Sequence, residues 1–212
     1  RLVGSEMCIR DSLSTALRNV NALLRLTTNL INFERADTYS NNFYVSEYEL
    51  GAYMTDIVNV FRSYASVKHI DLTYESNFRY LNVWLDKDKM DSILKNIISN
   101  ALKYTPEGGS VHVYAYETED TWNVEVSDTG IGIPLDEQKK LFKMHFRGSN
   151  AINSKVTGSG IGLLLVWKLV HMHKGKLNFT STEGKGSCIK VSFPKGEKRY
   201  RKAIPVSYTH LT

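Results

Sequence analysis

Apolar residues recur every three or four positions in four stretches of the chain, which is the spacing of an amphipathic helix. This pattern predicts helices over 12–37, from Ser46 onward, from an Asp86 cap onward, and over 161–173. The second begins at a capping box, in which Ser46 is followed three residues later by Glu49. The apolar stripe of the first is broader than a monomeric surface helix needs, which favours a partner helix. The alternative is that this helix packs on its own domain.

Alternation of apolar and polar residues predicts short strands at 70–74, 83–85, 110–117, 121–127, 176–182 and 187–193. The stretch 128–160 is rich in loop-forming residues and holds one short helix, near 136–142. Helices and strands thus mix without a strict βαβ alternation. The pattern therefore predicts an α+β protein in which helices are layered on a sheet.

Changes in composition divide the chain into parts. Residues 1–11 lack periodicity and resemble translated vector sequence, so we expect them to be non-native or disordered. The first helix, 12–37, is followed by a polar linker at 38–42. Residues 43–195 hold the remaining elements and are expected to form one domain. The basic tail, 196–212, ends in sequence that again looks non-native.

Overall composition is that of a globular protein, with 42% hydrophobic and 23% charged residues among 212. The longest apolar stretch, 161–170, is far shorter than the roughly 20 residues of a membrane-spanning helix. Two cysteines make neither a disulfide framework nor a zinc site, and they fit a reducing compartment. The net charge of +5 falls to +1 without four basic residues of the tail, so no nucleic-acid surface is predicted.

The first cluster of candidate chemistry lies on the predicted third helix. Asn96, Asn100 and Lys103 share one face of it, because residues three and four apart stack on a helix. Amide oxygens suit a hard cation such as Mg²⁺, which keeps most of its waters and binds phosphates. Lys103 adds a point charge for those phosphates. Taken alone, the cluster also fits a solvated polar face.

A second cluster begins at Asp128, which follows a predicted strand and precedes Gly130 and Gly132. Glycines let the backbone approach a flat ligand closely. A carboxylate at a strand end can accept a hydrogen bond from an exocyclic amine such as that of adenine. The alternative for this cluster alone is a turn capped by the aspartate.

A third cluster, Gly158, Gly160 and Gly162, opens the fourth helix. Backbone N–H groups at a helix N-terminus favour phosphate. The glycines are not a dinucleotide fingerprint, because no strand directly precedes them and no βαβ unit surrounds them.

In this order and spacing, the clusters resemble the ATP-binding domain of sensor histidine kinases, a relative of gyrase-type and heat-shock-chaperone-type ATPases. The matching segments are the N box (96–105), the G1 box (128–134), the F box (141–147), the G2 box (158–163) and a final glycine motif (184–187). The resemblance implies a two-layer sandwich of a mixed sheet and helices. More loosely, 12–37 looks like the second helix of the family's dimerisation hairpin, as in large hybrid sensors of gut Bacteroidetes type.

The resemblance also implies ATP and Mg²⁺ as cofactors and gives roles to the matching residues. Asn96 and Asn100 would bind the metal. The catalytic set would be Asn96, Lys103 and Arg147, with Arg147 on the γ-phosphate. Asp128 would bind the adenine amine, helped by Ser187 through water. The full set of implied nucleotide contacts is Asn96, Asn100, Lys103, Tyr104, Asp128, Gly130, Gly132, Gly158, Gly160, Gly162, Leu163 and Ser187; of these, Leu163 is expected to pack rather than to bind.

Two departures from the family pattern affect the expected chemistry. His145 and Phe146 stand where the F box usually has an aromatic pair; we expect His145 to pack in the lid rather than to act in catalysis. The phospho-acceptor motif (His, acid, any residue, Arg or Lys, Thr, Pro) is missing around all six histidines, which are His69, His112, His145, His171, His173 and His210. We therefore expect a fragment that starts after its acceptor helix.

Two functions of different class follow from the resemblance. The first is a kinase fragment that transfers the γ-phosphate of Mg-ATP to a histidine on the absent dimerisation helix. The second is a regulatory module that binds nucleotide without transferring it. The intact boxes favour the first. Its implied partners are the acceptor-histidine helices, a response regulator receiver domain and a second copy in a full-length homodimer, in the cytosolic part of a membrane-anchored bacterial sensor.

Overall fold

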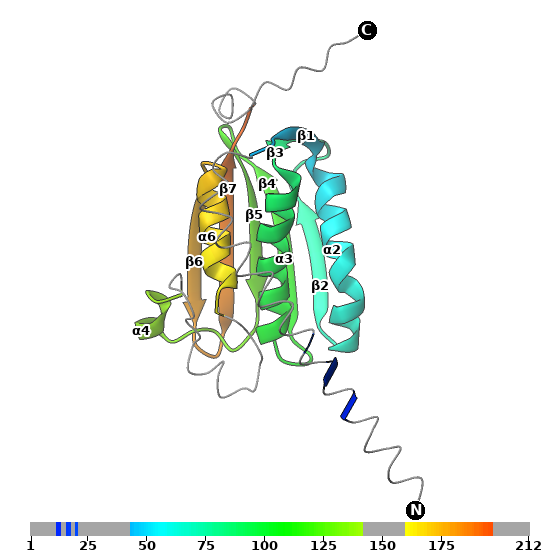
Figure 1. Cartoon of the computed structure of the whole chain (residues 1–212), viewed down its shortest axis with the longest axis vertical. Coiled ribbons are helices and arrows are strands. Elements are labelled where there is room, and N and C mark those ends of the chain that lie inside the picture. The colour runs from blue at the N-terminus through cyan, green and yellow to red at the C-terminus, as the bar shows by residue number, and fades with distance from the viewer. Residues whose placement is uncertain (1–11, 14–15, 18–19, 21–42, 142–159, 197–212) are drawn as a thin grey trace, which may run out of the picture.

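The computed structural model describes residues 12–13, 16–17, 20, 43–141 and 160–196. A five-stranded sheet is covered on one face by three helices that run alongside one another (Figure 1). The predicted α+β class and its two-layer arrangement are confirmed. The elements, in chain order, are β1 (Ser46–Glu49), α2 (Leu50–Val67), β2 (Asp71–Ser76), β3 (Asn82–Leu85), α3 (Lys87–Tyr104), β4 (Ser110–Glu117), β5 (Thr121–Asp128), α4 (Leu135–Gln138), α6 (Gly162–Met172), β6 (Lys176–Thr182) and β7 (Gly186–Pro194).

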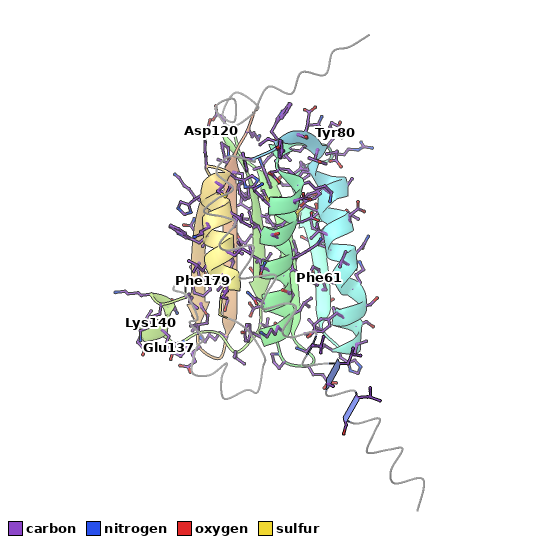
Figure 2. All side chains as sticks on the ribbon, in the orientation of Figure 1. Phe61, Tyr80, Asp120, Glu137, Lys140 and Phe179 are labelled. Carbon is purple, nitrogen blue, oxygen red and sulfur yellow. The ribbon has the colours of Figure 1, made fainter. Side chains whose placement is uncertain are left out.

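The sheet is mixed, with the strand order β2-β4-β5-β7-β6. β2 and β4 are parallel, and every other neighbouring pair is antiparallel. In the β5–β7 register, Asp128 lies opposite Ser187 at one end of the sheet. Asp120, before β5, and Tyr80 lie at the other end of the domain (Figure 2). The register thus brings two of the predicted site residues together, although they are far apart in sequence.

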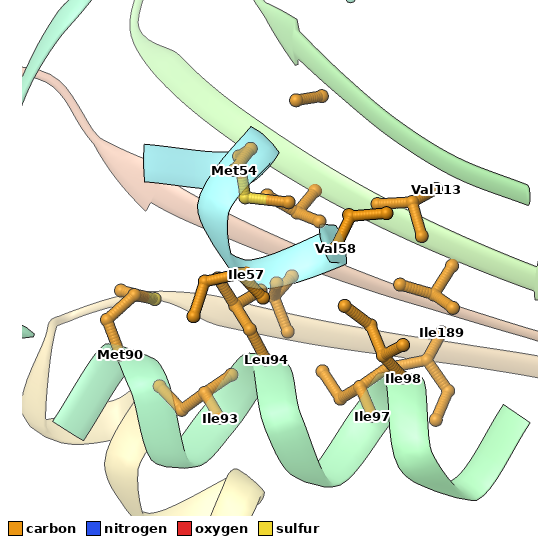
Figure 3. Packing of buried hydrophobic residues seen from close by; sticks show 14 of the residues in the cluster. Met54, Ile57, Val58, Met90, Ile93, Leu94, Ile97, Ile98, Val113 and Ile189 are labelled. Carbon is orange, nitrogen blue, oxygen red and sulfur yellow. The ribbon is translucent and has the colours of Figure 1, made fainter. Parts of the chain in front are cut away.

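The core lies between the sheet and the helices. Along β4 every second residue is buried, as the predicted alternation requires. In β5, Trp122, Val124 and Val126 follow the same alternation, and Asn123 is buried as well. The predicted apolar stripe of α3 is likewise fully buried. In the same buried cluster, Figure 3 shows Met54 and Ile57 of α2, Leu94 of α3, Val113 of β4 and Ile189 of β7. This packing orients α3, so that its opposite, polar face is left for the site.

The capping box predicted at Ser46 is wrong. Residues Ser46–Glu49 form β1, which pairs antiparallel with β3, and α2 begins only at Leu50. The N-cap is Glu49, whose carboxylate accepts hydrogen bonds from the N–H groups of Gly51 (2.9 Å) and Ala52 (2.5 Å). A partner strand supplied from elsewhere in the fold decides this local structure, and a four-residue motif contains no information about that partner.

Several sequence predictions fall outside the described residues. Of the helix predicted over 12–37, the described positions are helical, and the side chains of Leu13, Leu17 and Val20 among them are exposed. The terminal segments 1–11 and 197–212 lie outside the described residues, as does the F box apart from Leu141, which is buried. The short helix near 136–142 is observed as α4, which ends at Gln138.

A buried histidine, His173, links the end of α6 to the start of α3 at the end of the domain opposite to Asp128. His173 is fully buried, its Nδ1 lies 2.9 Å from the Leu169 carbonyl oxygen, and its Nε2 accepts a hydrogen bond from the Asp86 N–H at 3.3 Å. The Phe43 ring contacts it edge-on, at 4.7 Å between centroids. Burial lowers the pKa of His173 to about 4, because a charged imidazolium would lose its hydration. The folded protein therefore keeps this ring neutral.

We expect His173 to make the protein less stable in mild acid. The unfolded chain binds a proton near pH 6.5 and the folded chain only near pH 4, so stability is lost as pH falls through this window. At the lower end the loss should approach about 3 kcal/mol, from about 1.4 kcal/mol per pKa unit. His173→Gln, whose amide can make both hydrogen bonds but cannot titrate, should flatten this dependence. Urea unfolding of both proteins at pH 7 and pH 4.5 measures the change in the free energy of unfolding. An equal loss of stability in the wild type and in His173→Gln would show that His173 does not cause the pH dependence.

Candidate nucleotide-binding site

The candidate site is built around the carboxylate of Asp128, the last residue of β5. Its Oδ1 accepts hydrogen bonds from the N–H groups of Gly130 (2.8 Å) and Ser187 (3.3 Å). Among the described residues, none donates a hydrogen bond to Oδ2. Burial raises the pKa of Asp128, and the two backbone donors oppose that rise. The group is thus a half-buried acceptor with one oxygen left for a donor from a ligand.

The loop after Asp128 is held on two sides by backbone and side-chain hydrogen bonds. The Ile131 N–H donates to the Tyr104 carbonyl at the end of α3 (3.1 Å). On the other side, the Ile131 carbonyl accepts from the Gly184 N–H (2.9 Å), and the Ile133 N–H donates to Ser181 Oγ (2.9 Å). The loop therefore lies between the C-terminus of α3 and the β6–β7 turn, and its position depends on both.

Two glycines of this loop are required by close contacts. A Cβ atom on Gly130 would lie 2.6 Å from both Asp128 Oδ1 and the Tyr104 carbonyl oxygen. Gly132 has a positive φ of +61°, and a Cβ there would overlap the Thr182 carbonyl oxygen. The sequence predicts that these glycines lie against a flat ligand. In the structure they also let the loop approach α3 and the β6–β7 turn.

Ser187 joins the Asp128 carboxylate to a small hydroxyl pair. Its Oγ lies 3.0 Å from Ser181 Oγ, and Ser181 Oγ also contacts the Gly186 carbonyl oxygen at 2.9 Å. Ser187 therefore gives its N–H to the Asp128 carboxylate, while its hydroxyl pairs with that of Ser181. This fits a supporting role at an amine-binding position.

The polar face of α3 meets the N-terminus of α6. A Cβ atom on Gly162, the first residue of α6, would lie 2.7 Å from Asn96 Oδ1 and 4.0 Å from Asn100 Nδ2. Asn96 Nδ2 donates to the Ser92 carbonyl at 2.7 Å, which directs the amide oxygen of Asn96 toward α6. Because N–H groups of a helix's first turn lack internal partners, this junction combines anion-binding donors with amide oxygens.

Two more predicted site residues, Lys103 and Tyr104, are the last residues of α3. Lys103 Nζ is 3.4 Å from the Tyr104 hydroxyl and 4.9 Å from the centre of its ring. The carbonyl of Tyr104 holds the Asp128 loop, as described above. The last turn of α3 therefore carries a positive charge next to the loop that presents the carboxylate.

The structure thus brings together most of the predicted site residues. Gly160, with a positive φ of +69°, precedes α6, and Leu163 packs against the core as expected. Gly158 and Arg147 lie outside the described residues. No group of three or more carboxylate, histidine or cysteine side chains that could hold a metal ion occurs in the described part of the chain. A cation at Asn96 and Asn100 would therefore need further oxygens, such as those of phosphates.

The residues from 85 to 197, more than half of the chain, match the family model described as histidine kinase-, DNA gyrase B-, and HSP90-like ATPase. The chain belongs to this ATPase family. The matched range contains the Asp128 loop, the polar face of α3 and the start of α6. The resemblance drawn from the spacing of the boxes is confirmed.

Individual relatives of this ATPase domain are named as sensor kinases. The sensor histidine kinase WalK of Bacillus subtilis is 33% identical over 179 residues, covering 84% of this chain and 29% of WalK. Full-length ShkA, solved in complex with AMPPNP, shares the fold with a TM-score of 0.75 and 22% identity, over 87% of this chain and 38% of ShkA. Histidine kinase ThkA, solved with the response regulator TrrA, gives a TM-score of 0.63 at 22% identity, over 84% of this chain and 49% of ThkA.

The chain spans less than half the length of these curated relatives, with coverage that runs from 13% to 46% of the relative. Within the described residues of this ATPase domain, no helix has the length and apolarity needed to cross a membrane.

Two side chains that organise the loop were missed in the sequence. Ser181 binds the Ile133 N–H, and Gln138 Nε2 donates to the carbonyls of Ile133 and Ser181, each at 2.9 Å. Ser181 had a usable signal, since it follows Leu177 and Phe179 on the inward-facing register of β6, where a polar residue needs a partner. Gln138 had none, because its partners lie on other elements.

Proposed function

We propose that the chain is the ATP-binding catalytic part of a sensor histidine kinase, formed by residues 43–195, with 12–37 as the remnant of a dimerisation hairpin. The observation that carries this proposal is the Asp128 carboxylate. Its Oδ1 is held by two backbone N–H groups, and its Oδ2 accepts from no described residue, at the same end of the domain as the Asn96–Gly162 junction. Family membership supports ATP as the ligand.

In this proposal, Asp128 binds the adenine amine. A carboxylate accepts hydrogen bonds only, and the exocyclic amine of adenine donates, so the pair is complementary. Gly130 and Gly132 keep the loop clear for the flat base, and Ser187 supports the carboxylate through water. Specificity for adenine follows, because a carbonyl in place of the amine would face the carboxylate without a proton to share.

The phosphates, in the same proposal, lie along the polar face of α3 and at the start of α6. The amide oxygens of Asn96 and Asn100 hold Mg²⁺, with Lys103 and Tyr104 near the phosphates. Gly158, Gly160 and Gly162 form the turn whose N–H groups bind phosphate oxygens. When bound, Mg²⁺ would neutralise charge on the phosphate oxygens.

The proposed reaction is a phosphoryl transfer to histidine. A ring nitrogen of the acceptor histidine forms a bond to the γ-phosphorus while the bond from that phosphorus to the β–γ bridging oxygen breaks. The bridging oxygen keeps the electron pair and leaves as ADP. Lys103, together with Arg147 from the F box, stabilises negative charge on the phosphates. Asn96 has no useful basicity, so water is not activated and ATP hydrolysis stays slow.

The proposed partners follow from the reaction. Acceptor-histidine helices of the parent kinase supply the nucleophile, and a receiver domain of a response regulator takes the phosphoryl group onward. The solved complex of ThkA with TrrA supports a partner of this kind. We place the chain in the cytosolic part of a membrane-anchored sensor that works as a homodimer.

Incubation with Mg-ATP labelled at the γ-phosphate tests the proposal. The chain alone should stay unlabelled, since no histidine here has the acceptor motif, and an untethered nucleophile forfeits effective molarities of roughly 10⁵ M or more. A histidine-kinase dimerisation hairpin added in excess should become labelled, and the same hairpin with its acceptor histidine changed to glutamine should not. Nucleotide binding without any transfer would favour the regulatory module. Acid-labile label on the chain itself would contradict the proposal.

A further inference from the structure

Lys68, the residue that ends α2, contacts the C-terminus of α3. Its Nζ lies 2.8 Å from the carbonyl oxygen of Leu102, 3.3 Å from that of Lys103 and 3.1 Å from that of Thr105. An ammonium group has three N–H donors, and here all three converge on backbone oxygens. Figure 1 shows α2 and α3 side by side, ending at the same end of the domain.

These contacts complete the hydrogen bonding of the α3 terminus. The last four carbonyls of a helix have no partner within it. In α3, the Ala101 carbonyl accepts from the N–H and the hydroxyl of Thr105, and the Tyr104 carbonyl accepts from the Ile131 N–H of the Asp128 loop. The other two, on Leu102 and Lys103, accept from Lys68. Lys68 therefore holds the Leu102 and Lys103 carbonyls, and the Asp128 loop holds the Tyr104 carbonyl that follows them in the same helical turn.

The same turn carries two of the residues that we assign to the nucleotide. Lys103 and Tyr104 are its last helical positions, and a Cβ on Gly130 would lie only 2.6 Å from the Tyr104 carbonyl oxygen. A small displacement of the turn would therefore move the Asp128 loop and the Lys103 charge together. The positive charge of Lys68 also lies at the negative end of the α3 dipole, which favours the intact turn.

The corner that follows Lys68 is tied to its neighbours by backbone hydrogen bonds. The His69 carbonyl accepts from the Gly108 N–H, and the Asp71 N–H donates to the Gly109 carbonyl, both at 3.0 Å. The Ile70 N–H donates to the Ala65 carbonyl at the end of α2 at 2.9 Å. The ammonium is thus presented from a fixed frame to the end of α3.

We propose that Lys68 is a positioning residue for nucleotide binding, which fixes the last turn of α3 so that Lys103, Tyr104 and the Asp128 loop lie in register. This inference rests on the proposed function. Lys68 lies outside every nucleotide-binding box, at the C-cap of α2.

The test is the affinity for Mg-ADP, measured by calorimetry at a temperature where every variant is folded. Lys68→Met keeps the length of the side chain and removes the three donors, and we expect its Kd to rise about tenfold, as for loss of one or two net hydrogen bonds. Lys68→Arg should recover part of the loss, because its charge is kept but its planar fork does not converge in the same way. Lys95→Met, which removes an exposed ion pair of α3, should bind as the wild type does.

A further control separates positioning from stability. Val83→Ala removes buried methyl groups from β3, away from the site, so it should lower the melting temperature without changing the Kd. Wild-type affinity in Lys68→Met, or an equal loss of affinity in Val83→Ala, would overturn the inference. If Lys68→Met does not fold, Lys68→Gln, with a single amide group, takes its place under the same criteria. Failure of the wild type to bind Mg-ADP would instead refute the proposed function.

Discussion

Asp128→Asn should weaken binding of Mg-ADP by about 5- to 150-fold, which corresponds to about 1–3 kcal/mol. Affinity should fall because the N–H groups of Gly130 and Ser187 both donate to Oδ1 of Asp128. They would hold the amide oxygen of asparagine in that position and force its NH₂ group into the place of Oδ2. Two donors, the asparagine amide and the adenine amine, would then face each other without an acceptor.

Calorimetry on the folded proteins measures this loss. Asp120→Asn makes the same chemical change at the opposite end of the domain and should leave the affinity unchanged (Figure 2). Unchanged affinity in Asp128→Asn would remove the carboxylate from the adenine role and leave it as a cap of its own loop.

Of the glycine-to-alanine substitutions in the Asp128 loop, Gly132→Ala should cause the largest loss of stability. The methyl group would overlap the Thr182 carbonyl oxygen in addition to occupying a backbone conformation with φ of +61°. The conformation alone costs about 1 kcal/mol and the overlap about 1–3 kcal/mol more. The loop must move to relieve the overlap, so we also expect at least a tenfold loss of Mg-ADP affinity.

Gly184→Ala is the matched control for this variant. Gly184 has a similar φ of +72°, but a Cβ there would meet no atom within 4 Å. It should cost about 1 kcal/mol in the free energy of unfolding and leave the affinity unchanged, since its N–H still donates to Ile131. Chemical unfolding and calorimetry on both variants provide the measurement. Equal effects would show that the contact with Thr182 does not constrain the loop.

The periodicity of the sequence predicted the strands of the main sheet and α3 closely. The strand bounds 110–117 and 176–182 agree with the structure at both ends, and the Asp86 cap of α3 is observed, with its side chain accepting from the Lys89 N–H at 3.2 Å. These features depend on neighbours within a few positions, so the alternation and the capping residue are sufficient.

The candidate nucleotide-binding boxes could also be identified from the sequence, because residue type and spacing carry the chemistry that they suggest. Asn96 and Asn100 share a helix face by spacing alone. Asp128 is followed by Gly130 and Gly132, which stand where a side chain would collide with neighbouring backbone. The sequence therefore determined the family, the fold class and the candidate residues on each element.

Only the tertiary structure decided how these elements meet. It placed Asp128 opposite Ser187, turned the predicted capping box into β1, and brought Lys68 from α2 to the end of α3. Each of these contacts joins residues separated by more than 30 positions, and hydrogen bonds between such residues leave no periodic trace in either segment. Local patterns therefore determine the elements and their chemistry, whereas the register of the sheet and the packing of the helices determine which groups share one site.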